Sequence, residues 1–144
     1  MTARLLLVED SDDLRHLFAR VLRGHGFEVV EASDGYEALD RLAEFVPEVV
    51  VTDVMMPGMD GVELIRRIRA MPATAEVPVV AMSAAPTPEA EREALRAGAE
   101  DLLPKPLDSQ TLLERLAGLC RLHPTRPRRL STSFPVMRPP PGGI

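Results

Sequence analysis

Five short apolar segments recur along the chain, and each is followed by a longer segment with helical periodicity. Short apolar segments bounded by turn residues are typical of strands buried on both faces of a sheet. Five strand–helix pairs in succession predict an α/β fold, a doubly wound five-stranded parallel sheet covered by helices on both faces. The expected strands are Arg4–Val8, Phe27–Glu31, Glu48–Thr52, Val77–Met82 and Asp101–Leu103.

Apolar residues return every three or four positions between these strands, as in amphipathic helices. Asp12 or Asp13 is expected to cap the first helix, and Asp60 the third. The fourth helix, Glu89–Ala97, carries Leu95 as its only large apolar residue, so we expect it to be loosely attached. The other helices are expected from Asp12 or Asp13 to Gly24, from Asp34 to about Glu44, from Val62 to Pro72, and from an Asp108 or Ser109 cap onward.

Acidic residues dominate the body of the chain, while the end is basic. Before Arg121 the 22 acids outnumber the basic residues by ten, whereas Arg121–Ile144 holds five arginines and no acid. An acidic body is a poor partner for a phosphate backbone, so we expect no direct nucleic-acid binding. No apolar segment is long enough to span a bilayer, and a single cysteine excludes an internal disulfide. We therefore expect a cytoplasmic protein without membrane insertion.

Polar side chains follow four of the five expected strands. Glu9 and Asp10 follow the first strand, Asp53 the third, Ser83 the fourth and Lys105 the fifth. Ligands of open parallel sheets bind at the carboxyl ends of the strands, near the point where the strand order reverses. We therefore expect three carboxylates, one hydroxyl and one ammonium to meet at this edge of the sheet.

Three carboxylates in one crevice repel one another, so a cation is expected among them. Oxygen-only ligands without His or Cys favour a hard ion such as Mg²⁺ over zinc. Asp53 could then act as a nucleophile that forms an acyl phosphate. In that chemistry Lys105 would offset the charge of the phosphoryl oxygens, and Ser83 would donate a hydrogen bond to one of them.

In these features the chain resembles the receiver domain of response regulators from two-component systems. The resemblance rests on Glu9-Asp10, on Asp53 with the segment Met55–Gly61, on Ser83-Ala84 and on Lys105-Pro106, each at an expected strand end and in the expected order. It covers roughly residues 3–121, which we take as the receiver domain. Residues 122–144 form a basic, proline-rich tail that we expect to be disordered.

The resemblance implies a flavodoxin-like (βα)₅ fold with strand order 2-1-3-4-5. It also implies that Asp53 accepts a phosphoryl group from a sensor histidine kinase or a phosphotransfer protein. Mg²⁺ would be held by Asp10, Asp53 and the backbone carbonyl of Met55, with Glu9 contributing through water. Such a protein acts on a downstream protein partner or relays the phosphoryl group, as a monomer or as a weak dimer formed on phosphorylation. It is a phosphoacceptor and not an enzyme that turns over an external substrate.

Five positions depart from the usual family pattern or bear on how long a phosphoryl group would last. Glu9 replaces the commoner aspartate and Ser83 the commoner threonine, while Leu102 stands where the family often has Tyr or Phe. With Leu102 the usual coupling is altered, so we expect phosphorylation to act through the loop after the fourth strand and the Glu89–Ala97 helix. Met55 and Ala85 cannot orient a water molecule, which predicts a long-lived phosphoryl group.

Three alternatives remain open at this level. A phosphohydrolase that uses an aspartyl phosphate would need a second acid two residues after Asp53, where this chain has Met55. A receiver-like interaction module that is not regulated by phosphorylation would not need the complete set of acids, hydroxyl and lysine. The chain could also be the receiver fragment of a longer regulator.

Overall fold

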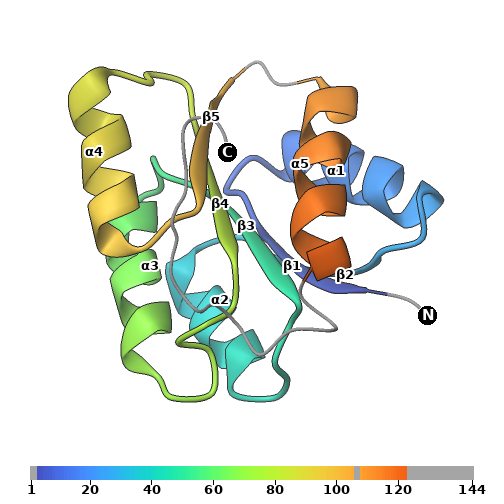
Figure 1. The fold of residues 1–144 in the computed structure, drawn as a ribbon, viewed down its shortest axis with the longest axis horizontal. Coiled ribbons are helices and arrows are strands. Elements are labelled where there is room, and N and C mark those ends of the chain that lie inside the picture. The colour runs from blue at the N-terminus through green and yellow to red at the C-terminus, as the bar shows by residue number, and fades with distance from the viewer. Residues whose placement is uncertain (1–2, 106–107, 123–144) are drawn as a thin grey trace.

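A parallel five-stranded sheet lies between two layers of helices in the structure, a computed structural model that describes residues 3–105 and 108–122 (Figure 1). The strand order β2-β1-β3-β4-β5 and the parallel pairing of all neighbours confirm the expected doubly wound topology. The strands are β1 (Arg4–Val8), β2 (Glu28–Ala32), β3 (Val49–Asp53), β4 (Val79–Ser83) and β5 (Asp101–Pro104).

Helices α1 and α5 cover one face of the sheet, and α2, α3 and α4 cover the other (Figure 1). Because side chains alternate along a strand, each central strand supplies both cores: Leu5 and Leu7 face the α1–α5 side, and Leu6 and Val8 face the opposite side. This two-sided burial explains why the strands are almost entirely apolar. The helices are α1 (Asp12–Gly24), α2 (Gly35–Leu42), α3 (Gly61–Ala70), α4 (Pro88–Ala97) and α5 (Ser109–Leu122).

The helix caps differ from the sequence prediction at one place. Ser11, and not Asp12 or Asp13, caps α1, because its hydroxyl accepts a hydrogen bond from the Leu14 amide at 3.3 Å while the Asp12 carboxylate binds Arg15. The predicted cap at Asp60 is confirmed by a 2.9 Å hydrogen bond from the Glu63 amide. The caps fix where each helix leaves the edge of the sheet.

The remaining boundaries shift by a residue or two for local reasons. Helix α2 begins after Asp34, which caps it, and ends at Leu42, two residues before the expected end. Strand β4 begins at Val79 and not at Val77, since Pro78 has no amide hydrogen to donate to the ladder. Asp108 caps α5, where it accepts a hydrogen bond from the Thr111 amide at 2.7 Å.

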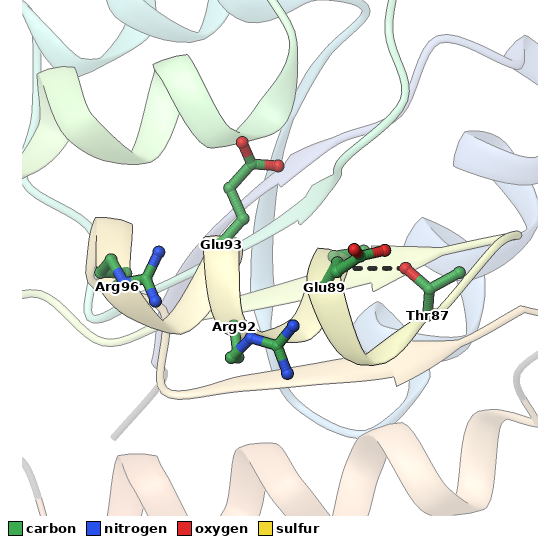
Figure 2. A pocket seen from close by; sticks show the side chains of 6 residues that line it. Thr87, Glu89, Arg92, Glu93 and Arg96 are labelled. Carbon is green, nitrogen blue, oxygen red and sulfur yellow. Dashed lines mark hydrogen bonds between the residues drawn. The ribbon is translucent and has the colours of Figure 1, made fainter.

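Helix α4 packs through small residues. Ala94 is fully buried, whereas Leu95, the one large apolar residue of the helix, is 44% exposed. Figure 2 shows Glu89, Arg92, Glu93 and Arg96 projecting from the helix, where they line an open surface hollow together with Thr87 and Ala90. Few large apolar contacts therefore hold this helix, and its loose attachment stays a prediction.

The C-terminal end of α4 is nevertheless anchored by a side chain that the sequence analysis did not single out. Arg69, at the end of α3, donates two hydrogen bonds to the carbonyl of Gly98, at 2.8 and 3.2 Å, and one to the carbonyl of Val77 at 2.6 Å. Gly98 has a positive φ of 122°, and a Cβ atom there would lie 2.7 Å from the Arg69 side chain. Arg69 thus connects α3 with the residues before β4 and with the turn before β5.

The order of the strands reverses between β1 and β3. Strand β1 pairs with β2 on one side and with β3 on the other, so the connections leaving β1 and β3 diverge to opposite faces of the sheet. Ligands of such sheets bind at the carboxyl edge beside this reversal of the strand order. The structure places the predicted site residues at this edge. The predicted tail, 122–144, falls beyond the described residues except for Leu122.

Candidate functional site

Three carboxylates meet at the carboxyl edge of the sheet, as the sequence predicted. Glu9 and Asp10 follow β1, and Asp53 is the last residue of β3. One oxygen from each side chain lies within 4.8 Å of the oxygens from the other two. Glu9 and Asp53 are buried, with 1% and 4% exposure, while Asp10 is exposed. The site thus combines two buried acids with one exposed acid.

Lys105 follows the end of β5 and contacts both buried acids. Its ammonium nitrogen lies 2.7 Å from Glu9 Oε1 and 3.0 Å from Asp53 Oδ2. Burial favours the neutral amine, but the hydrogen bonds to Glu9 and Asp53 outweigh it and raise the pKa of Lys105. Lys105 is therefore a permanent cation between two acids.

Burial has the opposite consequence for Glu9. It raises the pKa of the Glu9 carboxyl, and the hydrogen bonds from Lys105 and from the Ser11 amide offset only part of the effect. Both Glu9 oxygens are engaged, Oε1 with Lys105 and Oε2 with the Ser11 amide at 3.0 Å. A direct metal bond would have to displace one of these partners, which agrees with the indirect, water-mediated role that the resemblance implies for Glu9.

The Asp53 carboxylate is held from two sides. Oδ1 accepts a hydrogen bond from the Met55 amide at 3.2 Å, and Oδ2 accepts one from Lys105. The Met55 side chain is 63% exposed and points no polar group at the site. The two contacts orient the carboxylate before any ligand enters.

Ser83 ends β4 beside β3. Its side chain is buried, and its hydroxyl oxygen accepts a hydrogen bond from the Ala85 amide at 3.1 Å. The Lys105 amide donates to the Ser83 carbonyl at 2.8 Å, which couples the ends of β4 and β5. The hydroxyl and the ammonium are thus brought to the same edge of the sheet, as expected.

Asp10 differs from the other acids because it has no partner of its own. Within residues 3–105 and 108–122, its carboxylate makes no hydrogen bond or ion pair. An exposed carboxylate aimed at two others is well suited to a cation, and the ligand atoms of an octahedral Mg²⁺ at about 2.1 Å lie roughly 3–4 Å apart. The separation of up to 4.8 Å between the carboxylate oxygens requires only a small closure to fit such an ion.

Two further residues support the site: Arg15, which was not predicted, and Gly61, which was marked only as the end of the Met55–Gly61 segment. Arg15 is buried in α1 and donates a hydrogen bond to the Glu9 carbonyl at 2.9 Å. Gly61, the first residue of α3, lies so close to β3 that a Cβ atom would be 2.7 Å from the Val54 Cα. The only sequence signals were an arginine beside the apolar stripe of the first helix and a glycine after Asp60.

Leu102 is buried at the second position of β5 and belongs to the core on the side of α3 and α4. An aliphatic side chain there packs beneath α4 without a polar group to reach solvent. None of the helices in the described part of the chain is long and apolar enough to cross a membrane.

Comparisons with known proteins agree with this fold. The family model "Response regulator receiver domain" matches residues 5–117. Response regulator MprA of Mycobacterium sp. (strain KMS) is 39% identical over 121 residues, and that of Mycobacterium tuberculosis (strain ATCC 25177 / H37Ra) is 38% identical. Each alignment covers 84% of this chain and 52% of the relative, so the chain spans about half the length of these curated relatives.

Solved structures give the same result. The chemotaxis protein CheY4 of Vibrio cholerae has a TM-score of 0.80 at 32% identity, over 83% of this chain and 99% of that one. A putative response regulator from Chloroflexus aurantiacus J-10-fl also reaches 0.80, at 34% identity, over 85% of this chain and 100% of that one. With the family model matching most of the sequence, the chain belongs to the response regulator receiver domain family of two-component systems.

Proposed function

We propose that Asp53 accepts a phosphoryl group from a phosphohistidine of a sensor histidine kinase or of a phosphotransfer protein. The observation that carries the proposal is the placement of Asp53: its buried carboxylate contacts Lys105 at 3.0 Å and lies beside the oxygens of Glu9 and Asp10. A carboxylate that lies between the Lys105 cation and two acids arranged to bind a metal ion is suited to attack a phosphorus atom.

In the reaction, a carboxylate oxygen of Asp53 forms a bond to phosphorus while the bond between phosphorus and the donor imidazole nitrogen breaks. The imidazole leaves with the electron pair of that bond and is protonated. The contacts from Lys105 and the Met55 amide fix the carboxylate, so little reorientation is needed before attack. Lys105 then faces the phosphoryl oxygens, and the Ser83 hydroxyl can donate a hydrogen bond to one of them.

Asp10, Asp53 and the backbone carbonyl of Met55 are the proposed ligands of Mg²⁺, with Glu9 acting through water. When bound, the ion would neutralise the oxygens of the incoming phosphoryl group. The oxygen-only donors and the exposed Asp10 carboxylate, which has no partner in the part of the chain that the structure describes, support this assignment.

The acyl phosphate is proposed to be long-lived. Attack by water needs a side chain that orients the water molecule, and the positions two beyond Asp53 and two beyond Ser83 are Met55 and Ala85. Met55 also stands where a phosphohydrolase would carry its second acid. We therefore propose that the protein acts as a phosphoacceptor. Loss of the phosphoryl group within seconds would contradict this part of the proposal.

The output of the phosphorylated chain is proposed to be altered binding of a protein partner, or onward transfer of the phosphoryl group. We assign residues 3–121 to the receiver unit and expect a monomer or a weak dimer formed on phosphorylation. Because the chain spans 52% of the MprA relatives, a role as the receiver part of a longer regulator is the second candidate. A mixed-sign charge pattern on α4 and an acidic body speak against direct binding of nucleic acid.

Phosphorylation can be tested without knowing the kinase. The full chain is incubated with acetyl phosphate and Mg²⁺, and intact mass spectrometry is used to count phosphoryl adducts. We expect one adduct on the wild type, none on Asp53→Asn, and strongly reduced labelling without Mg²⁺. A wild type that never labels, from acetyl phosphate or from a matched kinase, would favour the phosphorylation-independent interaction module.

A further inference from the structure

Arg15 is the one buried arginine in the described part of the chain. A buried guanidinium needs partners for its fork of donors. Two of those partners, the Glu9 carbonyl and the Asp12 carboxylate, lie at the ends of the β1–α1 loop, and the third is the Glu31 carboxylate on β2. The contacts give this side chain a role at the acid site.

The guanidinium binds both ends of the β1–α1 loop, which carries Asp10. Nη1 donates to the Glu9 carbonyl at 2.9 Å, and Nη2 donates to the Asp12 carboxylate at 2.8 Å. Nε donates to the Glu31 carboxylate on β2 at 3.1 Å, which anchors the guanidinium to the sheet. Asp10 therefore sits between two residues that are tied to the same arginine.

A second set of contacts holds the other side of the loop. The Glu9 amide donates to the Ala32 carbonyl at 3.1 Å, and Glu9 Oε2 accepts from the Ser11 amide at 3.0 Å. Every residue of the loop except Asp10 is thus held by a hydrogen bond. Because Asp10 has no side-chain partner in the described residues, the position of its carboxylate depends on its neighbours.

We propose that Arg15 is a positioning residue for the cation site, because it clamps the Glu9–Asp12 loop and so fixes the Asp10 carboxylate opposite Asp53. The inference rests on the proposed function, in which Asp10 and Asp53 bind Mg²⁺. Arg15 acts through geometry and not through its charge, since Asp12 and Glu31 neutralise the guanidinium.

A lysine at this position would keep the charge but not the fork. Its single ammonium cannot donate along the three directions that the guanidinium serves. Arg15→Lys therefore separates the effect of the hydrogen-bond geometry on Mg²⁺ affinity from the effect of the positive charge. Residues that orient metal ligands from outside typically contribute 10–100-fold to metal affinity, and we expect a loss of about tenfold here.

Arg23 offers a matched control. It also pairs with Glu31, at 3.2 Å, and donates to the Val29 carbonyl at 2.9 Å, but it has no contact with the Glu9–Asp12 loop. Arg23→Gln thus removes a guanidinium from the same acid while leaving the loop held. We expect its Mg²⁺ affinity to match the wild type.

The experiment titrates Mg²⁺ into the full chain by calorimetry, for the wild type, Arg15→Lys, Arg15→Gln and Arg23→Gln. Both Arg15 variants should bind about tenfold more weakly. Labelling by acetyl phosphate should recover the wild-type rate at saturating Mg²⁺, because the loss lies in affinity and not in the chemical step. Should the Arg15 variants not fold, Asp12→Ala removes the acceptor of one arm of the clamp at an exposed carboxylate and should weaken binding to a smaller extent.

The outcomes distinguish a failure of the proposed function from a failure of the role proposed for Arg15. A wild type that binds no Mg²⁺ refutes the proposed function, and the inference falls with it. A wild type that binds Mg²⁺ while the folded Arg15 variants, or Asp12→Ala in their place, bind equally well refutes only the role of Arg15. A tenfold loss that appears equally in Arg23→Gln would assign the effect to Glu31 or to general stability, and would also overturn the proposal.

Discussion

The ammonium nitrogen of Lys105 lies 2.7 Å from Oε1 of Glu9, across 96 residues of sequence. Glu9 is 1% exposed, so this contact is made out of bulk water. In the metal-free protein, Lys105 supplies the positive charge that a cluster of acids requires. Mg²⁺ and Lys105 would therefore both offset the negative charge of the same carboxylates.

Replacing Lys105 by Met should expose this coupling. The variant leaves the Glu9 and Asp53 carboxylates buried without a cation, which typically destabilises a protein by about 3 kcal/mol. Mg²⁺ should restore more stability to Lys105→Met than it adds to the wild type, since the ion would offset the same charges. Urea unfolding with and without Mg²⁺ measures both effects.

The control for this experiment is Arg92→Met on the exposed surface of α4. Arg92 makes no hydrogen bond or ion pair in the described residues, so its replacement should leave the free energy of unfolding nearly unchanged. Equal stability of Lys105→Met and the wild type in the absence of Mg²⁺ would show that the two acids tolerate burial without Lys105.

The raised pKa of Glu9 predicts a pH dependence of stability in Mg²⁺-free buffer. Burial moves the folded-state pKa above the ordinary value of 4.5, so the protonated form is favoured by folding. The resulting contribution is fully present below pH 4.5 and is lost as the pH rises through the folded-state pKa. Glu9→Gln cannot titrate, so the stability of the wild type minus that of the variant should decrease from pH 4.5 upward.

Urea unfolding at a series of pH values tests this prediction, with the exposed Glu44→Gln as the baseline for a glutamate outside the site. If the difference instead grows with pH, the hydrogen bonds from Lys105 and Ser11 outweigh the cost of burying the Glu9 carboxylate. That result would reverse the sign assigned to the pKa shift.

A side chain at Gly61 should disrupt the floor of the site. A Cβ atom there would lie 2.7 Å from the Val54 Cα and closer still to the Asp53 carbonyl oxygen, and neither backbone atom can move without displacing β3. We expect Gly61→Ala to lower the free energy of unfolding by about 3 kcal/mol and to slow phosphorylation of Asp53. Thermal or urea unfolding and the acetyl phosphate assay provide the measurements.

Gly24, the last residue of α1, is the matched glycine. No atom lies within 4 Å of a Cβ built at this position, so Gly24→Ala should be neutral or slightly stabilising. Similar losses of stability in Gly61→Ala and Gly24→Ala would mean that the close approach to β3 is not the cause.

Phosphorylation should change amide hydrogen exchange between Ser83 and Gly98. The Ser83 hydroxyl accepts a hydrogen bond from the Ala85 amide, and rotation of the hydroxyl toward a phosphoryl group would weaken that bond. We expect several-fold faster exchange at Ala85 and in the first turns of α4. Gly98 should change little, because Arg69 holds its carbonyl at 2.8 Å.

Exchange measured by mass spectrometry or NMR, before and after treatment with acetyl phosphate, tests this route of signalling. Asp53→Asn treated in the same way controls for effects of the reagent. Unchanged exchange across residues 83–98 in a fully phosphorylated sample would exclude the β4–α4 loop as the output.

Much of the fold could be predicted because its signals are local. The Val49-Val50-Val51 segment is apolar throughout, which marks a strand covered on both faces, and the structure buries all of it. The spacing of Leu14, Phe18 and Leu22 likewise defines the α1 face. The errors are local too: Ser11 caps α1, because Asp12 is drawn to Arg15 by a contact that helix propensity cannot reveal.

The sequence alone determined which residues could do chemistry, because parallel strands all end at the same edge and the acids, Ser83 and Lys105 follow those ends. Only the tertiary structure decided how they are used. Lys105 bridges Glu9 and Asp53, Asp10 has no side-chain partner among the described residues, and Arg15 turns inward to hold the loop. These relations join residues from different strands and helices, and their distances depend on how the sheet twists and packs, which no local pattern of residues encodes.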